Sequence, residues 1–237
     1  MAHPIKAVLF DLDDTLFDHH HSMQAGLLAM QQAYPGLQRW PLQDLTNTYV
    51  ELLESLHVQV LQGLLTPEQA RIQRIQRFFL KYDQRLSLDA IPDSVILYRD
   101  AYQAARRVVP GALALLEYVH ARAQTGVITN NTSLEQREKL DTYGLMPWMD
   151  VVVISEEVGV TKPDPAIFNI ALERLDCSPA QAVMLGDSWE VDVLGARQAG
   201  IRPVWFNRFG SPRPDESVTM IDALEPAQAI AELLLTQ

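Results

Sequence analysis

The sequence predicts an α/β protein built on a parallel sheet, with an all-helical segment inserted near the start of the chain. Three observations favour this class. A short apolar run at residues 5–10 has the composition of a buried strand, and about ninety residues with only helical spacing follow it. From residue 110 onward, apolar runs alternate with helical segments. Strands and helices that take turns at this spacing are typical of a parallel sheet with helices on both faces.

The first strand is expected at residues 5–10, a run rich in apolar and β-branched side chains. Directly behind it come four acids: Asp11, Asp13, Asp14 and Asp18. An apolar run favours burial, whereas clustered carboxylates repel one another and favour water. We therefore expect the strand to end at the edge of the core, with the acids just beyond it.

The next segment, roughly residues 22–107, contains no strand signal and is expected to be helical throughout. One helix is indicated by apolar residues at helical spacing: Leu42, Leu45, Tyr49, Leu52, Leu56 and Val60. A second is expected after Thr66-Pro67-Glu68-Gln69, a capping box with proline at the first helical position. The predicted domains are therefore a helical insertion at 18–107 and a sheet domain made of 1–17 and 108–237.

The second half of the chain supplies the remaining elements of the sheet domain. Strands are expected at 126–128, 151–154, 182–185 and 202–206, and helices at 112–121, 133–144, 165–175, 187–199 and from about 226. The helix at 133 is predicted from Ser133-Leu134-Glu135-Gln136, which has the spacing of a capping box.

Composition narrows the possible partners and the compartment. The formal net charge of −11 argues against nucleic acid, because phosphate backbones are held by lysine and arginine. Cys177 is the single cysteine, which fits a reducing compartment. The N-terminal apolar run ends in acids too soon for a signal peptide, and no run approaches the ~18 apolar residues that a membrane helix needs. We expect a cytoplasmic protein, monomeric or homodimeric, that does not act at a membrane.

Polar residues follow the predicted strands at the points where they end. They are Asp11 and Asp13 after the first strand, Thr129 and Asn130 after the second, Lys162 shortly after the third, and Asp187 after the fourth. Any one of them has an ordinary alternative role as a turn residue, a helix cap or a solvated charge. In an open parallel sheet, however, ligands bind beyond the carboxyl ends of the strands, and all of these residues fall there.

This set of residue types suits phosphate chemistry. Crowded carboxylates that stay ionised need a cation, and an all-oxygen site favours a hard ion such as Mg²⁺. A lysine beside them suits a phosphate. A carboxylate can also act as a nucleophile and form an aspartyl-phosphate.

Together these residues resemble the haloacid dehalogenase-like hydrolase superfamily. The resemblance rests on four motifs in order: Asp11-Leu12-Asp13-Asp14-Thr15, Thr129-Asn130, Lys162-Pro163, and Gly186-Asp187-Ser188 with Asp192. It implies a Rossmann-like core and a helical cap inserted after the first motif. The run Ile154-Ser155-Glu156-Glu157-Val158-Gly159-Val160 is similar to that of nucleotidase-type phosphatases in the group.

The resemblance also implies roles for individual residues. Asp11 would be the nucleophile, and Asp13 would protonate the leaving oxygen and then activate water. Mg²⁺ would be held by the Asp11 carboxylate, the Asp13 backbone carbonyl and Asp187, with Asp192 supporting the metal or Lys162. Thr129, the backbone N–H of Asn130 and Lys162 would hold the phosphoryl oxygens.

The expected function is Mg²⁺-dependent hydrolysis of a small phosphorylated metabolite, with nucleoside 5′-monophosphates as the favoured substrates. The dehalogenases of this superfamily lack the second aspartate of the first motif, so Asp13 points to phosphate rather than halide. A sugar phosphomutase of the same superfamily is an alternative. A non-catalytic protein that binds a phosphometabolite is a further one, although such a protein would be expected to have lost a key acid or the lysine.

Overall fold

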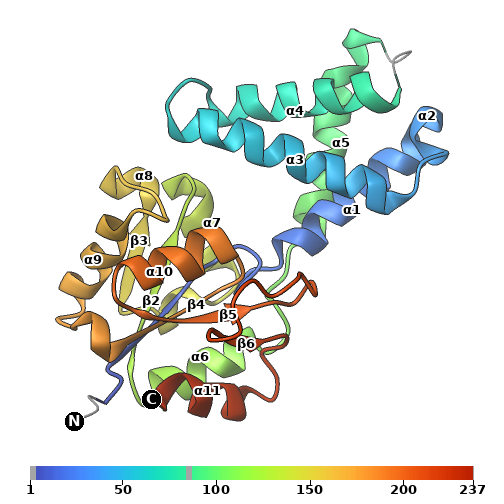
Figure 1. Cartoon of the computed structure of the whole chain (residues 1–237). Coiled ribbons are helices and arrows are strands. Elements are labelled where there is room, and N and C mark those ends of the chain that lie inside the picture. Colours follow the sequence, from blue (N-terminus) through green and yellow to red (C-terminus); the bar gives the residue numbers. More distant parts are fainter. Residues whose placement is uncertain (1–3, 84–86, 237) are drawn as a thin grey trace. The chain divides into compact units, whose positions relative to one another are not determined.

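The computed structural model describes residues 4–83 and 87–236, which form two compact units (Figure 1). One unit consists of Met1–Asp18 together with Arg107–Gln237, and the other of His19–Arg106. The first unit carries the sheet and the second is helical. Among the described residues, no helix has both the length and the apolar character needed to cross a bilayer.

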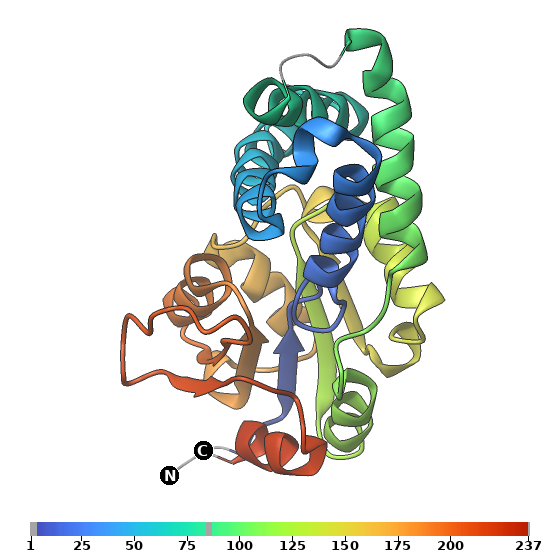
Figure 2. The same cartoon turned by 90° about the vertical axis from the view of Figure 1, so that its right-hand side faces the viewer.

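The sheet contains six parallel strands in the order β3-β2-β1-β4-β5-β6. They are β1 (Ala7–Phe10), β2 (Gln124–Thr129), β3 (Val151–Ile154), β4 (Ala182–Gly186), β5 (Arg202–Phe206) and β6 (Thr219–Ile221). Figure 2 shows β1 (blue) between β2 and β4. Because β1 pairs on both sides and all four of its residues are fully buried, the acids that follow it emerge at the middle of the sheet.

Helices cover both faces of this sheet, which confirms the predicted α/β class. They are α6 (Ala112–His120), α7 (Ser133–Thr142), α8 (Ser155–Val158), α9 (Pro165–Arg174), α10 (Leu194–Gln198) and α11 (Ala227–Leu235). Short 3₁₀ turns lie at Met146–Trp148 and Pro179–Gln181, and a π-helical segment, Trp189–Val193, precedes α10. Helix α6 packs against β2, and α11 packs on α6.

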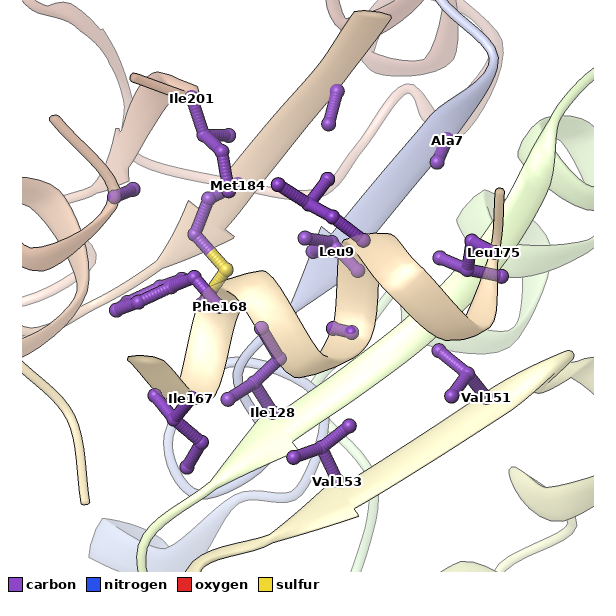
Figure 3. Close-up of a cluster of buried hydrophobic side chains, with 14 residues drawn as sticks. Ala7, Leu9, Ile128, Val151, Val153, Ile167, Phe168, Leu175, Met184 and Ile201 are labelled. Carbon is purple, nitrogen blue, oxygen red and sulfur yellow. The ribbon is translucent and has the colours of Figure 1, made fainter. Parts of the chain in front are cut away.

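A buried apolar cluster packs α9 against the face of the sheet opposite α6 (Figure 3). Ile167 and Phe168 of α9 lie against Leu9 of β1, Ile128 of β2 and Met184 of β4. Side chains alternate between the two faces of a strand, so the buried neighbours of Leu9 in β1 point to the face covered by α6. Because β1 is buried on both faces, its sequence is an uninterrupted run of apolar residues and does not alternate between apolar and polar.

The helical unit contains five α-helices and one 3₁₀ turn among its described residues. They are α1 (His19–Ala33), α2 (Pro35–Gln38), α3 (Leu42–Leu61), α4 (Pro67–Tyr82), the turn Leu88–Ala90 and α5 (Ile91–Ala104). The predicted capping box at the start of α4 is confirmed: Thr66 and Gln69 bond each other's backbone N–H. Aromatic side chains form much of this unit's core, with Tyr49 and Phe78 in edge contact at 5.9 Å between ring centroids.

The two chain segments that connect the units run side by side. The Asp18 N–H donates to the Arg107 carbonyl at 2.9 Å, and Val109 N–H donates to the Leu16 carbonyl at 2.8 Å. The Asp18 carboxylate is buried and pairs with Arg107 at 2.8 Å and with Arg208 at 3.0 Å. Asp18 therefore neutralises cations from two distant parts of the chain at the base of the insertion.

Two sequence expectations about the sheet unit were wrong. Ser133 does not cap α7: Thr132 occupies that position without a side-chain cap, and the Ser133 backbone N–H and hydroxyl bond Glu156 and Glu157 instead. The sixth strand, β6, was not predicted. It is only three residues long, and one of them is exposed, so it lacks the apolar run by which the other strands were recognised.

Candidate active site

The first component of the site is the carboxylate of Asp11, at the carboxyl end of β1. The Asp11 backbone N–H continues the sheet by donating to the Leu185 carbonyl at 2.9 Å. Its side chain accepts a hydrogen bond from the Lys162 ammonium at 2.5 Å, and the residue is only 7% exposed. The central strand thus ends in a buried carboxylate that makes a short ionic contact with a lysine 151 residues away in the sequence.

Lys162 reaches Asp11 because Asn130 clamps its backbone. The Asn130 side chain accepts from the Lys162 N–H and donates to the Lys162 carbonyl, both at 2.8 Å. Asn130 follows β2, so this two-point contact ties the loop between α8 and α9 to the end of β2. The peptide bond between Lys162 and Pro163 is cis. The Asn130 side chain is therefore structural in this arrangement, and its backbone N–H is the group that stays a candidate for phosphate.

Asp192 is the second carboxylate on Lys162. Its Oδ1 accepts from the Lys162 ammonium at 2.6 Å, and its Oδ2 accepts from the Ser188 N–H at 3.0 Å. Asp192 is 1% exposed. At Gly186, where β4 ends, a Cβ would lie 2.4 Å from the Asp192 carboxyl carbon. The glycine therefore makes the room that lets Asp192 turn toward Lys162.

Asp187 completes a group of three carboxylates. Ligand oxygens of Asp11, Asp187 and Asp192 lie within 4.8 Å of one another, as the donors around one metal ion do. Thr15 positions Asp187 through two contacts: its hydroxyl donates to the carboxylate at 3.3 Å and accepts from the Asp187 N–H at 3.1 Å. The indole N–H of Trp205 holds the Asp187 carbonyl at 2.8 Å.

The electrostatics of this group reflect an excess of negative charge. Burial raises the pKa of Asp11 to about 7, with a further increase from Asp192 and a decrease from Lys162. Burial, followed by the charges of Asp11 and Asp192, raises the pKa of Asp187 well above its usual value. Burial alone would lower the pKa of Lys162, but the charges and hydrogen bonds of its two aspartates outweigh burial and raise it. Three acids thus share one lysine, a combination typical of functional sites.

Asp13 and Thr129 lie in a neighbouring hydrogen-bond network rather than on Lys162. The Asp13 carboxylate accepts from the Lys139 ammonium at 2.7 Å and from the Gln136 amide at 2.9 Å. The same Gln136 amide donates to the Thr129 hydroxyl at 2.6 Å. Asp14 takes a positive φ of 63° in the turn that follows, as expected for a turn residue.

Three side chains of this arrangement were missed in the sequence: Thr15, Gln136 and Lys139. Gln136 was assigned to a helix cap, because the spacing Ser-x-x-Gln is the same whether the glutamine caps a helix or faces inward. Lys139 lies in the polar run Glu135-Gln136-Arg137-Glu138-Lys139, where nothing distinguishes a buried lysine from a solvated one. Only Thr15 carried a signal, since it belongs to the first motif.

Comparisons with known proteins agree with this geometry. The chain matches the haloacid dehalogenase-like hydrolase family over residues 5–200. It is 31% identical over 218 residues to the pyrimidine 5′-nucleotidase YjjG of Escherichia coli, with 88% of each protein covered. It is 32% identical over 204 residues to the glyceraldehyde 3-phosphate phosphatase of Pyrococcus furiosus, covering 85% of this chain and 80% of that protein.

A solved structure agrees with the fold. The crystal structure of the HAD-hydrolase YfnB from Bacillus subtilis, bound to magnesium, superimposes with a TM-score of 0.74 at 24% identity, covering 97% of this chain and 99% of that one. That likeness concerns the fold alone. The family match spans most of the chain and both curated relatives exceed 30% identity, so the chain belongs to the haloacid dehalogenase-like hydrolases and is an enzyme of that family.

Proposed function

We propose that the protein is a Mg²⁺-dependent phosphomonoester hydrolase that works through an aspartyl-phosphate on Asp11. The observation that carries the proposal is the Asp11 carboxylate itself, buried at the end of the central strand and held by Lys162 beside two more acids. A carboxylate held by one lysine, at a site whose remaining negative charge a divalent cation would offset, is suited to attack the phosphorus of a phosphomonoester.

Two proton transfers complete this chemistry. A carboxylate oxygen of Asp11 attacks phosphorus, and the ester oxygen leaves with a proton from Asp13. Asp13, now ionised, then takes a proton from the water that attacks the phosphorus of the aspartyl-phosphate. This second attack releases inorganic phosphate and restores Asp11. Lys162, the Thr129 hydroxyl and the Asn130 N–H are the donors for the phosphoryl oxygens.

The donor set fits a magnesium ion. Asp11, Asp187 and Asp192 offer only oxygen, and their combined charge exceeds that of Lys162. Asp11 and Asp187, together with the backbone carbonyl of Asp13, are the ligands we assign, and Asp192 orients Lys162 from behind. When bound, the ion supplies positive charge that offsets the anionic phosphoryl group.

The raised pKa values predict how magnesium and pH together affect stability. Asp11 and Asp187 bind protons more tightly in the folded, metal-free protein than in the unfolded chain, so their contribution to stability is lost as pH rises through about 7. Mg²⁺ binds the ionised carboxylates, so its binding should restore the stability that is lost when these groups give up their protons. The increase in Tm on adding millimolar Mg²⁺ should therefore be small at about pH 5.5 and reach several degrees at about pH 8.

Asp187→Asn provides the matched control for this measurement by differential scanning calorimetry. The variant removes one assigned metal ligand, which is also a carboxyl group with a raised pKa. Its Tm should therefore respond little to Mg²⁺ at either pH. A Mg²⁺ effect in the unmodified protein that is equal at both pH values would show that these carboxylates do not hold the ion.

We assign the helical unit, residues 19–106, the role of a cap that excludes bulk water and selects the substrate. The favoured substrates are nucleoside 5′-monophosphates, supported by the similarity to a pyrimidine 5′-nucleotidase over 88% of the chain. The similarity to a glyceraldehyde 3-phosphate phosphatase makes small sugar phosphates the second class to test. Fold alone does not choose between them.

A screen of phosphorylated metabolites tests the proposal. Released inorganic phosphate is measured with Mg²⁺ and with EDTA, and kcat/KM is compared across nucleotides, sugar phosphates and phosphoglycolate. We expect Mg²⁺-dependent phosphate release, with the largest kcat/KM on a pyrimidine nucleotide. Formation of an isomeric sugar phosphate without free phosphate would assign the protein to the phosphomutases, and no turnover of any phosphoester would refute the proposal.

A further inference from the structure

Helix α7 buries polar side chains on the face where a helix in an α/β protein normally carries apolar ones. Gln136, Lys139 and Leu140 are all fully buried, at the spacing that places them on one face. A lysine buried to this extent costs several kcal/mol unless its charge is paired. Apolar residues would pack better at these positions, so the burial of Gln136 and Lys139 needs another explanation.

The shortest contacts of the pair are to one carboxylate, that of Asp13, while Lys139 also pairs more loosely with Glu135 on its own helix at 3.6 Å. The Lys139 ammonium donates to Oδ1 of Asp13 at 2.7 Å and to the Gln136 amide oxygen at 2.8 Å. The Gln136 amide nitrogen donates to Oδ2 of Asp13 at 2.9 Å and to the Thr129 hydroxyl at 2.6 Å. Lys139 also lies over the Phe17 ring at 5.1 Å, a cation–π contact that favours this position of its ammonium.

This geometry fixes every group in the network. The two hydrogens of the Gln136 amide go to Asp13 and Thr129 and its oxygen faces Lys139, so the amide has one orientation. Each oxygen of Asp13 has its own donor, which prevents the carboxylate from rotating. The Thr129 hydroxyl accepts from Gln136, which leaves its own hydrogen to be donated. Asp13 nevertheless remains 26% exposed at its side chain, so it is held from one side and open on another.

We propose that Gln136 and Lys139 are positioning residues that hold Asp13 where it can transfer a proton, and that couple Asp13 to Thr129. The inference rests on the proposed function, because it assigns a task to the acid and base of that reaction. Neither residue touches the reacting atoms; both act through Asp13. The coupling means that the proton donor and one donor to the phosphoryl oxygens are set by the same glutamine.

Leaving-group dependence separates this role from a general structural one. Alkyl phosphates need a proton on the departing oxygen, whereas 4-nitrophenyl phosphate releases a stable anion and needs little help. Because kcat/KM reports the steps up to leaving-group departure, Lys139→Met should lower it about 100-fold for alkyl phosphates and only about threefold for 4-nitrophenyl phosphate. A plot of log kcat/KM against leaving-group pKa should become steeper.

The second half-reaction supplies another signal. Water attack on the aspartyl-phosphate also needs Asp13, so Lys139→Met and Gln136→Leu should both show a burst of nitrophenolate followed by slow turnover. Arg137→Met is the control, since Arg137 lies on the same helix but is exposed and pairs with Glu157. It should leave both the slope and the burst as they are in the unmodified protein.

A double-mutant cycle guards against variants that simply fold poorly. If Lys139 acts only through Asp13, adding Lys139→Met to Asp13→Asn should change kcat/KM by less than about twofold. An equal loss for all leaving groups, or an additive loss in the double variant, would overturn the inference. Wild-type turnover of aryl and alkyl phosphates is measured first; the absence of turnover with every phosphoester would refute the proposed function rather than this assignment.

Discussion

The Asp11→Asn variant is expected to lose turnover by at least ~10³-fold on every substrate while the fold stays intact. An amide oxygen is a far poorer nucleophile than a carboxylate and cannot form the acyl phosphate. Asparagine keeps the size of the side chain and can still accept the hydrogen bond from Lys162, so the site has no reason to collapse. Because the substitution also removes one of three crowded negative charges, the Tm of the metal-free protein should stay the same or rise.

Two measurements make this result specific. After rapid acid quench with labelled substrate, the phosphoryl group should be recovered on the unmodified protein as a hydroxylamine-sensitive species, and should be missing from Asp11→Asn. Asp14→Asn is the matched control: it removes an acid from the same turn, and asparagine tolerates the positive φ found there. Its kcat/KM should stay within about threefold. A labelled Asp11→Asn protein, or one that keeps a tenth of its activity, would place the nucleophile elsewhere.

The sheet and its polar edge could be predicted from the sequence because both follow from local rules. Each long apolar run ends in residues that water or a ligand must satisfy, and parallel strands bring those ends to one edge. Asp11, Lys162 and Asp187 are therefore expected at one edge although they come from three distant segments, and the family resemblance adds Asp192, which lies five residues after Asp187. The structure brings these four side chains together through direct contacts and close carboxylates.

The rest could not be predicted because it depends on tertiary contacts. The Ser133-x-x-Gln136 spacing satisfies a capping box equally well, and only the position of α7 beside Asp13 turns Gln136 inward. Burial of Lys139 is a property of the assembled site, since its partner lies 126 residues earlier in the chain. Gly186 likewise has no sequence signal for its role, which is to make space for Asp192.

These missed residues show that the site has two separate supports. One support is Lys162, in the loop between α8 and α9, whose backbone Asn130 holds and whose ammonium contacts Asp11 and Asp192. The other is α7, which faces Asp13 and Thr129. Asp11 and Asp13, the proposed nucleophile and acid, are two residues apart in the chain, yet each is held by a different cation from a different element. Their orientations can therefore be perturbed one at a time.

Lys162→Met is the second change with a large expected effect, and it should act on both catalysis and folding. Loss of a positioned donor to the phosphoryl oxygens should lower kcat by about 10²–10³-fold. Removing the cation also leaves Asp11 and Asp192 buried without their partner, which should lower the free energy of unfolding by about 3–5 kcal/mol. The loss should be greater at about pH 8 than at about pH 6, because without Lys162 the buried Asp11 carboxylate, whose pKa burial already raises, can be neutralised only by a proton.

A compensating variant distinguishes charge from packing in this result. Methionine keeps most of the length of lysine, so Lys162→Met/Asp192→Asn removes one of the two uncompensated charges with little change in volume. In denaturant unfolding this double variant should recover part of the stability lost by Lys162→Met, while its activity stays low. Lys6→Met, which removes an exposed lysine from the same unit, should change neither quantity. If the double variant is no more stable than Lys162→Met, Lys162 stabilises the fold through its packing. The ion pairs between Lys162 and the buried aspartates would then not be what stabilises the site.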